Sequence, residues 1–182
     1  LAHTILALPF VLVAVTATSI VGIQAAMFYL AAYAFMNIGA FGVVTHFARR
    51  GERYVEINDL AGYGYKQPVV AGMMTLFLLS LIGVPLTAGF FGKFYIFKAA
   101  LDSNLIWLSI LGLINSAVAA YYYLRIIVVM YMYAPTEAVE GLPRIAPGLS
   151  AAIAISAIAT VFFGIFPNFL LDYAGQSAVL VK

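Results

Sequence analysis

The first 48 residues of this chain contain no Asp, Glu, Lys or Arg. About 20 apolar residues suffice for one helix to cross the roughly 30 Å hydrocarbon core of a bilayer, so this stretch is long enough for two crossings. A weak break at Gly22–Gln24 divides it into two expected helices, at about residues 4–21 and 25–47. Since only 9% of the residues in the whole chain are charged, we predict an all-α integral membrane protein.

A second long apolar region covers residues 68–101, after a charged loop at 49–67. As one continuous helix it would be about 50 Å long, well beyond the hydrocarbon core. Gly83 and Pro85 lie near its middle, and Pro removes a helical hydrogen-bond donor. We therefore expect a helix at 69–101 that is broken near 84–88, because broken helices occur at membrane depth where backbone is buried or lines a cavity.

Two further helices are expected at about residues 105–132 and 149–166, followed by an amphipathic tail. The chain is then a single transmembrane domain over residues 1–182, with about five transmembrane helices of which one is broken. If the broken helix crosses once, most of the loop Lys and Arg fall on one side of the membrane. That side is predicted to be cytoplasmic, because short cytoplasmic loops carry an excess of Lys and Arg.

The composition excludes several kinds of site. The sequence has no Cys, so disulfides, thiolate catalysis and Cys-ligated metals are excluded. The two histidines, His3 and His46, are not spaced as metal ligands, and a formal net charge of +2 is too small to indicate a nucleic-acid partner. No phosphate-binding loop, nucleophile elbow or dinucleotide motif is present. We therefore predict no metal and no cofactor in this chain, whose surroundings are the lipid bilayer.

Lys93 is the residue that most strongly suggests chemistry. It follows the predicted helix break, and no charged residue lies between Gln67 and Lys93. A charged side chain at the centre of a bilayer costs about 2.5–3.5 kcal/mol on insertion scales, so it must face the bundle interior, water or a counter-ion. The functional interpretation is a proton-relay residue. The alternative is a Lys that extends along its apolar stem to the lipid head groups.

Several polar residues are candidates for a proton path around Lys93. Ser116 and Tyr123 share one face of the expected helix at 105–132. Each candidate has a structural alternative, because small and polar residues also promote close packing between membrane helices. The candidate set is His3, Thr87, Asn115, Ser116 and Tyr123.

Four ordered segments resemble the antiporter-like subunits of respiratory complex I, and the resemblance covers nearly the whole chain. N-type subunits, which include mitochondrial and plastid relatives, are the most similar. The segments are FYLAAYAFMNIGAF at 28–41, INDLAG at 57–62, LLSLIGVPLTAGFFGKFY at 78–95, and Asn115-Ser116 with AYYYLR at 120–125. In that family, two inverted repeats of five helices each contain a broken helix.

The resemblance implies that this chain corresponds to the C-terminal inverted repeat of a fourteen-helix subunit. It also implies that Lys93 is the terminal proton-relay residue of that repeat. Lys rather than Glu at this position argues against subunit M. The N-terminal repeat of the family is not in this sequence, so we expect a C-terminal fragment that cannot translocate protons alone.

The function implied by the resemblance is that of a proton-translocating membrane-arm subunit of an NADH-quinone oxidoreductase. Such a subunit is a non-redox part of a translocase, and it couples quinone reduction elsewhere to proton transfer through buried Lys. Flavin, iron–sulfur clusters and quinone are expected in other subunits. The expected partners are other membrane-arm subunits, especially a neighbouring antiporter-like subunit. The expected location is the bacterial inner membrane or, alternatively, an energy-transducing organellar membrane.

Two other functions stay open from the sequence. An Mrp-type cation/proton antiporter subunit shares the fold, although the tyrosine run before Arg125 favours complex I. A membrane scaffold without a pumping role is the third possibility. A buried Lys directly after a helix break argues against a scaffold, which gains nothing from such a residue.

Overall fold

The computed structural model describes residues 9–14, 16, 19–48 and 56–180. Within these ranges all regular elements are helical and there is no strand. A short helical segment at 9–14 comes first. The labelled elements are α2 (Ile20–Ala48), η1 (Ile57–Leu60), α3 (Tyr63–Lys66), α4 (Pro68–Ile82), α5 (Ala88–Asp102), α6 (Ile106–Met132), α7 (Glu137–Glu140), α8 (Pro147–Ile165) and α9 (Pro167–Leu180).

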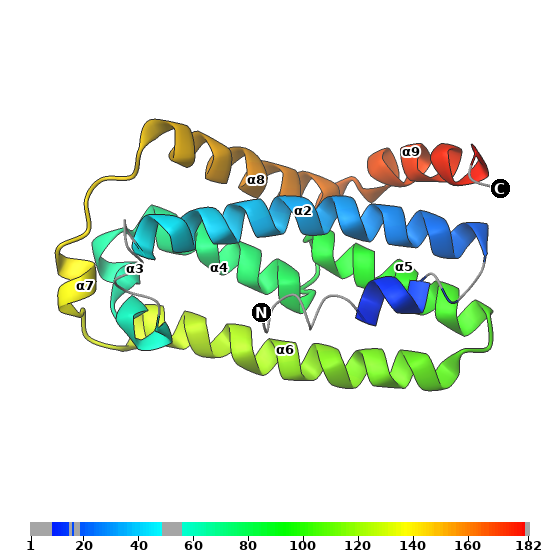
Figure 1. Ribbon diagram of the computed structural model, residues 1–182, viewed down its shortest axis with the longest axis horizontal. Helices are drawn as coiled ribbons and strands as arrows, with labels where there is room; N and C mark the ends of the chain where they lie inside the picture. Colours follow the sequence, from blue (N-terminus) through cyan, green and yellow to red (C-terminus); the bar gives the residue numbers. More distant parts are fainter. Residues whose placement is uncertain (1–8, 15, 17–18, 49–55, 181–182) are drawn as a thin grey trace.

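The long helices lie side by side, with α2 in the middle of the bundle (Figure 1). α2 contacts α4, α5, α8 and α9, and α6 packs against α4 and α5. The helices α4 and α5 follow one another along the bundle and form one interrupted rod (Figure 1). The break between them lies inside the bundle, so every element around it can contribute to a site there.

Small residues explain how α2 can be contacted on so many sides. Buried Gly and Ala recur along it, and they let the backbones of neighbouring helices approach closely. The ring of Phe77, from α4, lies directly against Gly39 and is completely buried. A helix that is apolar all round is typical of a buried or membrane-spanning helix.

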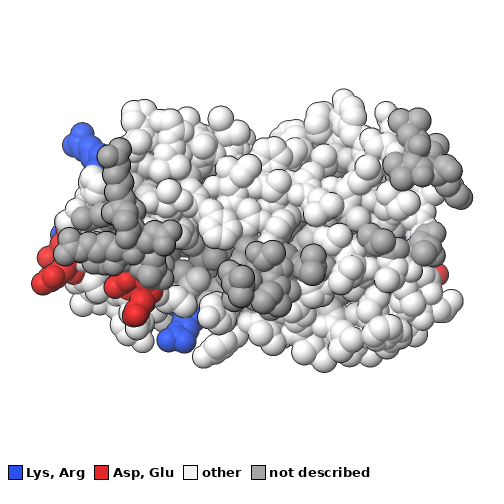
Figure 2. All heavy atoms as spheres, in the orientation of Figure 1, with Lys and Arg blue, Asp and Glu red and all other residues white. Residues whose placement is uncertain are grey.

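Three of the described helices, α2, α6 and α8, are long and apolar enough to cross a membrane, and α4 is a shorter apolar helix. Charged side chains in Figure 2 gather mainly at the end of the molecule that carries α3 and α7, with a wide uncharged surface beyond them. The outer face of α6 is apolar and exposed, including Trp107, Ile114 and Tyr121. Such a surface fits lipid or another apolar protein rather than water.

The start of α2 differs from the sequence prediction. The break expected at Gly22–Gln24 is absent, and α2 begins at Ile20. Ser19 lies just before α2 and caps it, because its Oγ accepts a hydrogen bond from Gly22 N at 3.0 Å. Gln24 is a helical residue whose side chain donates to Leu171 O at 2.8 Å. The helix expected at 4–21 lies partly outside the described residues.

The other helices begin and end within a few residues of the expected positions. The interrupted rod consists of α4 and α5, separated by 83–87, where a break near 84–88 is expected. α6 begins at Ile106, and α8 begins at Pro147, a favoured residue in the first turn of a helix. The tail after residue 166 forms α9, which packs back on α2.

The contact between Gly39 and Phe77 gives a stability prediction. We expect Gly39→Ala to lower the unfolding free energy by about 1–3 kcal/mol, because the added methyl group overlaps a buried ring that has no room to move. Gly72→Ala is the matched control, since no atom beyond its chain neighbours and the nearby backbone of its own helix lies within 4 Å of the position that its Cβ would take. Thermal unfolding of the detergent-solubilised protein measures both. Equal midpoints for the two variants would contradict this packing.

Candidate functional site

The end of α4 leaves backbone carbonyls without helical partners. Gly83, with φ 98°, ends the helix in the left-handed conformation that favours glycine. Both Gly83 N and Val84 N donate to Leu79 O, at 3.0 and 3.1 Å. The residue four positions after Leu81 is Pro85, which has no N–H to donate. The last carbonyls of α4 are therefore available to another donor.

The start of α5 is held by a side chain of α4. Ser80 Oγ is buried, accepts a hydrogen bond from Gly89 N at 3.1 Å and donates to Met36 Sδ at 2.8 Å. Thr87 precedes α5, but its hydroxyl donates to Val84 O at 2.7 Å and does not cap the helix. A side chain at residue 89 would collide with the Ser80 carbonyl, so glycine permits this close approach.

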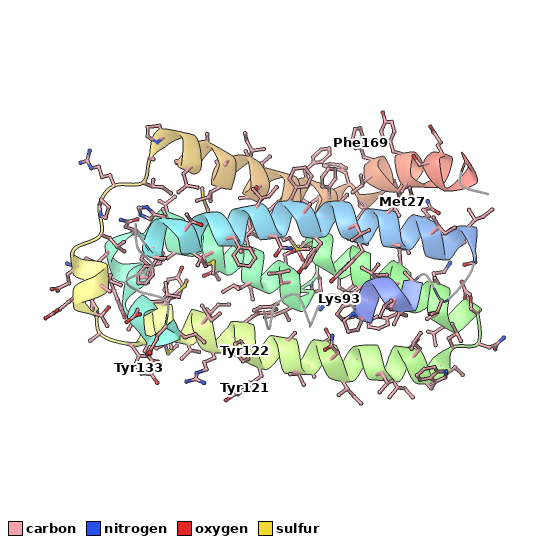
Figure 3. All side chains as sticks on the ribbon, in the orientation of Figure 1. Met27, Lys93, Tyr121, Tyr122, Tyr133 and Phe169 are labelled. Atoms are coloured by element: carbon pink, nitrogen blue, oxygen red, sulfur yellow. The ribbon has the colours of Figure 1, made fainter. Side chains whose placement is uncertain are left out.

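Lys93 of α5 reaches back into the break and binds the free carbonyls (Figure 3). Its Nζ donates to Leu81 O, Ile82 O and Ser116 Oγ, each at 2.9 Å. Ser116 belongs to α6, so this amine joins both halves of the broken helix to a third element. An ammonium group has three donors, and all three are used.

The surroundings of the Lys93 amine contain partial negative charges and no carboxylate that pairs with it. Lys93 is only 7% exposed, and in the described part of the chain it forms no ion pair. The carbonyls at the C-terminal end of α4 carry the negative end of that helix dipole. The ring of Phe10 adds a cation–π contact, with Nζ 4.7 Å from the ring centroid. Among the described residues, the charge is thus stabilised by dipoles and by an aromatic ring.

Other described Lys and Arg side chains differ from Lys93, because they are exposed. Lys98, one turn further along α5, is 57% exposed and lies 3.9 Å from Asp102. A solvated pair of this kind contributes little to stability. Lys93 is therefore a buried amine, and Lys98 is a surface residue of the same helix.

A small cavity lies beside the Lys93 amine. Three tyrosines line it together with apolar residues, and the volume open to the centre of a water molecule is about 10 Å³. That is about the space needed for one water molecule. The lining residues are Phe10, Tyr29, Tyr33, Leu81, Lys93, Ala119 and Tyr123.

The structure brings together some of the residues selected from the sequence. Lys93 binds Ser116 directly, and Tyr123 lines the cavity beside the amine. Thr87 lies in the break, with its hydroxyl bonded to Val84 O. Asn115 precedes Ser116 in α6 and does not line the cavity. His3 lies outside the described residues.

Sequence reasoning missed the part of the site that α2 and the 9–14 segment provide. Tyr29 and Tyr33 are one helical turn apart in α2, with stacked rings whose centroids are 5.7 Å apart. Their spacing in an uncharged helix is a signal that could have pointed to them. Phe10 offered no such signal, because nothing local distinguishes it from other apolar residues.

Comparisons with known proteins point to the same family. The family model described as NADH:quinone oxidoreductase/Mrp antiporter, TM, matches residues 3–119. The chain is 61% identical over 173 residues to the NADH-quinone oxidoreductase subunit N 1 of Solibacter usitatus, a match that covers 95% of this chain and 36% of that protein. The chain spans 27–36% of the length of the first curated relatives that it matches.

Two solved structures have a similar fold. Respiratory complex I from Thermus thermophilus matches with a TM-score of 0.72 and 25% identity, over 94% of this chain and 44% of the matched chain. The Mrp complex from Dietzia sp. matches with a TM-score of 0.80 and 22% identity, over 93% of this chain and 39% of the matched chain. At that identity, the second match shows a likeness of fold alone.

The interlocking of α4 and α5 gives a second prediction. Ser80→Ala removes the acceptor for the buried Gly89 N–H, so we expect a loss of about 1–3 kcal/mol in unfolding free energy. Ser109→Ala is the matched control, because the buried Ser109 hydroxyl has no hydrogen-bond partner in the described structure. Its removal should be neutral or stabilising. Similar losses for both variants in thermal unfolding would contradict a capping role for Ser80.

Proposed function

The chain belongs to the NADH:quinone oxidoreductase/Mrp antiporter transmembrane family, and on this premise we propose that it forms part of a proton-translocating membrane-arm subunit of an NADH-quinone oxidoreductase. The 61% identity to a subunit N supports this proposal. The subunit would carry out no redox step and would hold no cofactor. It would couple quinone reduction elsewhere in the complex to proton movement through its own buried groups.

The proposed architecture is a set of five crossings that correspond to the C-terminal inverted repeat of such a subunit. Three long apolar helices support three crossings. The rod formed by α4 and α5 supports a fourth, since its two 15-residue halves are together about 45 Å long. The fifth would include the helical segment at 9–14. We place the domain in a bacterial inner membrane, beside the other membrane-arm subunits and in particular a neighbouring antiporter-like subunit.

The proposal rests on the buried amine of Lys93, whose hydrogen-bond acceptors are all formally neutral. A carboxylate partner would hold the ammonium form strongly. Backbone carbonyls and a hydroxyl stabilise it less, so the neutral amine is also accessible. We propose that Lys93 takes up and releases a proton during turnover.

Ser116 gives the site a way to accommodate both forms of Lys93. With the ammonium, the Ser116 hydroxyl accepts a hydrogen bond from Nζ. When Nζ has lost a proton, its lone pair can accept a hydrogen bond, and the hydroxyl can turn and donate it. The two carbonyls keep the two remaining N–H groups. Every hydrogen and lone pair of Nζ then has a partner in either state, which avoids the cost of a buried unsatisfied amine.

The proton would exchange with water in the cavity next to Lys93. Tyr123, Tyr33 and Tyr29 line this cavity, and phenol hydroxyls can both donate and accept. Thr87, Asn115 and His3 remain proposed members of a longer path. Thr87 and Asn115 would act without a direct bond to the amine, whose three hydrogen bonds are made to other groups.

An Mrp-type cation/proton antiporter subunit is the second candidate, because the description of the matching family names Mrp antiporters as well. The likeness to the Dietzia Mrp complex concerns the fold alone, whereas the relative at 61% identity is named as an oxidoreductase subunit. The two candidates differ in the driving force. Proton movement driven by NADH oxidation supports the oxidoreductase, and proton movement driven by a sodium gradient supports the antiporter.

The test is proton pumping by the complete complex in proteoliposomes, with Lys93→Met made in the full-length subunit. We expect proton transfer through this subunit to fall by about 100-fold or more, the contribution typical of a positioned proton donor and acceptor. The proton-to-electron ratio of the complex would therefore fall by the share that this subunit contributes. Met preserves length and apolar volume, so assembly on a native gel should be normal.

Lys98→Met is the matched control, because it removes an exposed ammonium from the same helix. We expect this variant to pump at the wild-type ratio. A wild-type ratio in an assembled Lys93→Met complex would contradict the relay role and favour the non-pumping scaffold.

A further inference from the structure

An open pocket of about 510 Å³ lies where the α3–α4 junction meets the segment between α7 and α8. It belongs to the end of the bundle near α3 and α7, where charged side chains gather in Figure 2. It shares no lining residue with the cavity at Lys93. Its walls combine two basic residues with apolar ones: Lys66 and Arg144, and Val69, Val70, Leu142 and Ile145.

Gln67 fixes the two walls of this pocket relative to each other. Its Nε2 donates to Pro143 O at 3.0 Å, which ties the start of α4 to the segment before α8. Its Oε1 contacts Tyr63 OH at 3.5 Å and His46 Nε2 at 3.2 Å. Because this oxygen can only accept, both partners donate to it. Burial raises the pKa of the Tyr63 phenol, so it keeps the proton that it donates.

The charge of the pocket is positive on both walls. Lys66 comes from α3 and Arg144 from the segment before α8, and both side chains are exposed. In the part of the chain that the structure describes, no Asp or Glu lines the pocket. Among the described residues, neither Lys66 nor Arg144 forms an ion pair. No side chain caps the first turn of α4 at this point, so the positive end of its dipole adds to the same field.

The apolar part of the pocket includes the first turn of α4. Val69 is 68% exposed, although it belongs to the first turn of an apolar helix. The helices α2, α4 and α8 all begin or end at this level, at Ala48, Pro68 and Pro147. Lys and Arg at the ends of membrane helices lie near the level of the lipid head groups. A ligand here therefore meets cations on one side and apolar side chains on the other.

We propose that this pocket binds the phosphate group of an anionic phospholipid, with the adjoining glycerol and acyl carbons against the valines. Arg can bind phosphate oxygens in a bidentate manner, and Lys supplies a point charge from the opposite wall. Free phosphate would use only the cations, whereas a lipid also uses the apolar lining. A bound lipid would link α3 to the segment between α7 and α8, beside the hydrogen bond from Gln67 to Pro143 O.

Photo-cross-linking in the complete complex tests this site independently of proton pumping. The complex is placed in phosphatidylcholine nanodiscs that contain a minor fraction of photoreactive phosphatidylglycerol, and labelled peptides are mapped by mass spectrometry. We expect labelling at residues 66–70 and 142–145, and much weaker labelling with photoreactive phosphatidylcholine. Lys66→Gln and Arg144→Gln should each weaken apparent binding about fivefold, the effect of removing one cation near an anionic lipid surface.

Arg125→Gln is the matched control, because Arg125 is an exposed cation that does not line the pocket. It should leave the labelling unchanged, and all three variants should retain electron transfer and pumping. Equal labelling by the two lipids, or labelling that neither pocket variant reduces, would overturn the proposal. Displacement of the photoreactive lipid by millimolar inorganic phosphate would also overturn it, since the site would then bind a free anion.

Discussion

The three hydrogen bonds of the Lys93 amine join both halves of the broken helix to α6. A helix that stops inside a bundle leaves carbonyl groups without donors, and burying them unpaired costs free energy. A lysine at the same depth has donors that lack acceptors, because its ammonium group has lost its hydrating water. Here each feature satisfies the other, since Nζ donates to Leu81 O and Ile82 O. Each feature therefore lowers the free-energy cost of burying the other.

The break also requires particular side chains on the helices around it. Ser80 must hold the first turn of α5, and Ser116 must bring α6 to the amine. Gly83 packs closely against the alkyl chain of Lys93, because a Cβ at residue 83 would lie 3.3 Å from Lys93 Cδ. These contacts hold the backbone around the amine, while the hydroxyl of Ser116 can turn from acceptor to donor. In the proposed relay, a proton would then move with little rearrangement of the backbone.

The sequence was informative where a feature stood out against an apolar background. Gly83, Pro85 and Lys93 are such features, and they predicted a broken helix followed by a buried amine. The start of α2 was not predicted, because Gly22 and Gln24 indicate a break in the sequence, whereas Ser19 caps a helix that continues through both residues. The contact with Phe10 could not be predicted, because helices that are apolar all round do not show which side chains meet across the bundle. The grouping of Tyr29, Tyr33 and Tyr123 required the fold for the same reason.

The relay role of Lys93 can be measured as the proton-to-electron ratio of the complete complex with Lys93→Arg in the full-length subunit. Arg keeps a cation that can bind the carbonyls of α4, but its guanidinium does not release a proton in proteins. If Lys93 is a relay, the assembled variant will transfer electrons with a lowered ratio. A wild-type ratio would show that a permanent cation suffices at this position, and Lys93 would then only stabilise the broken helix.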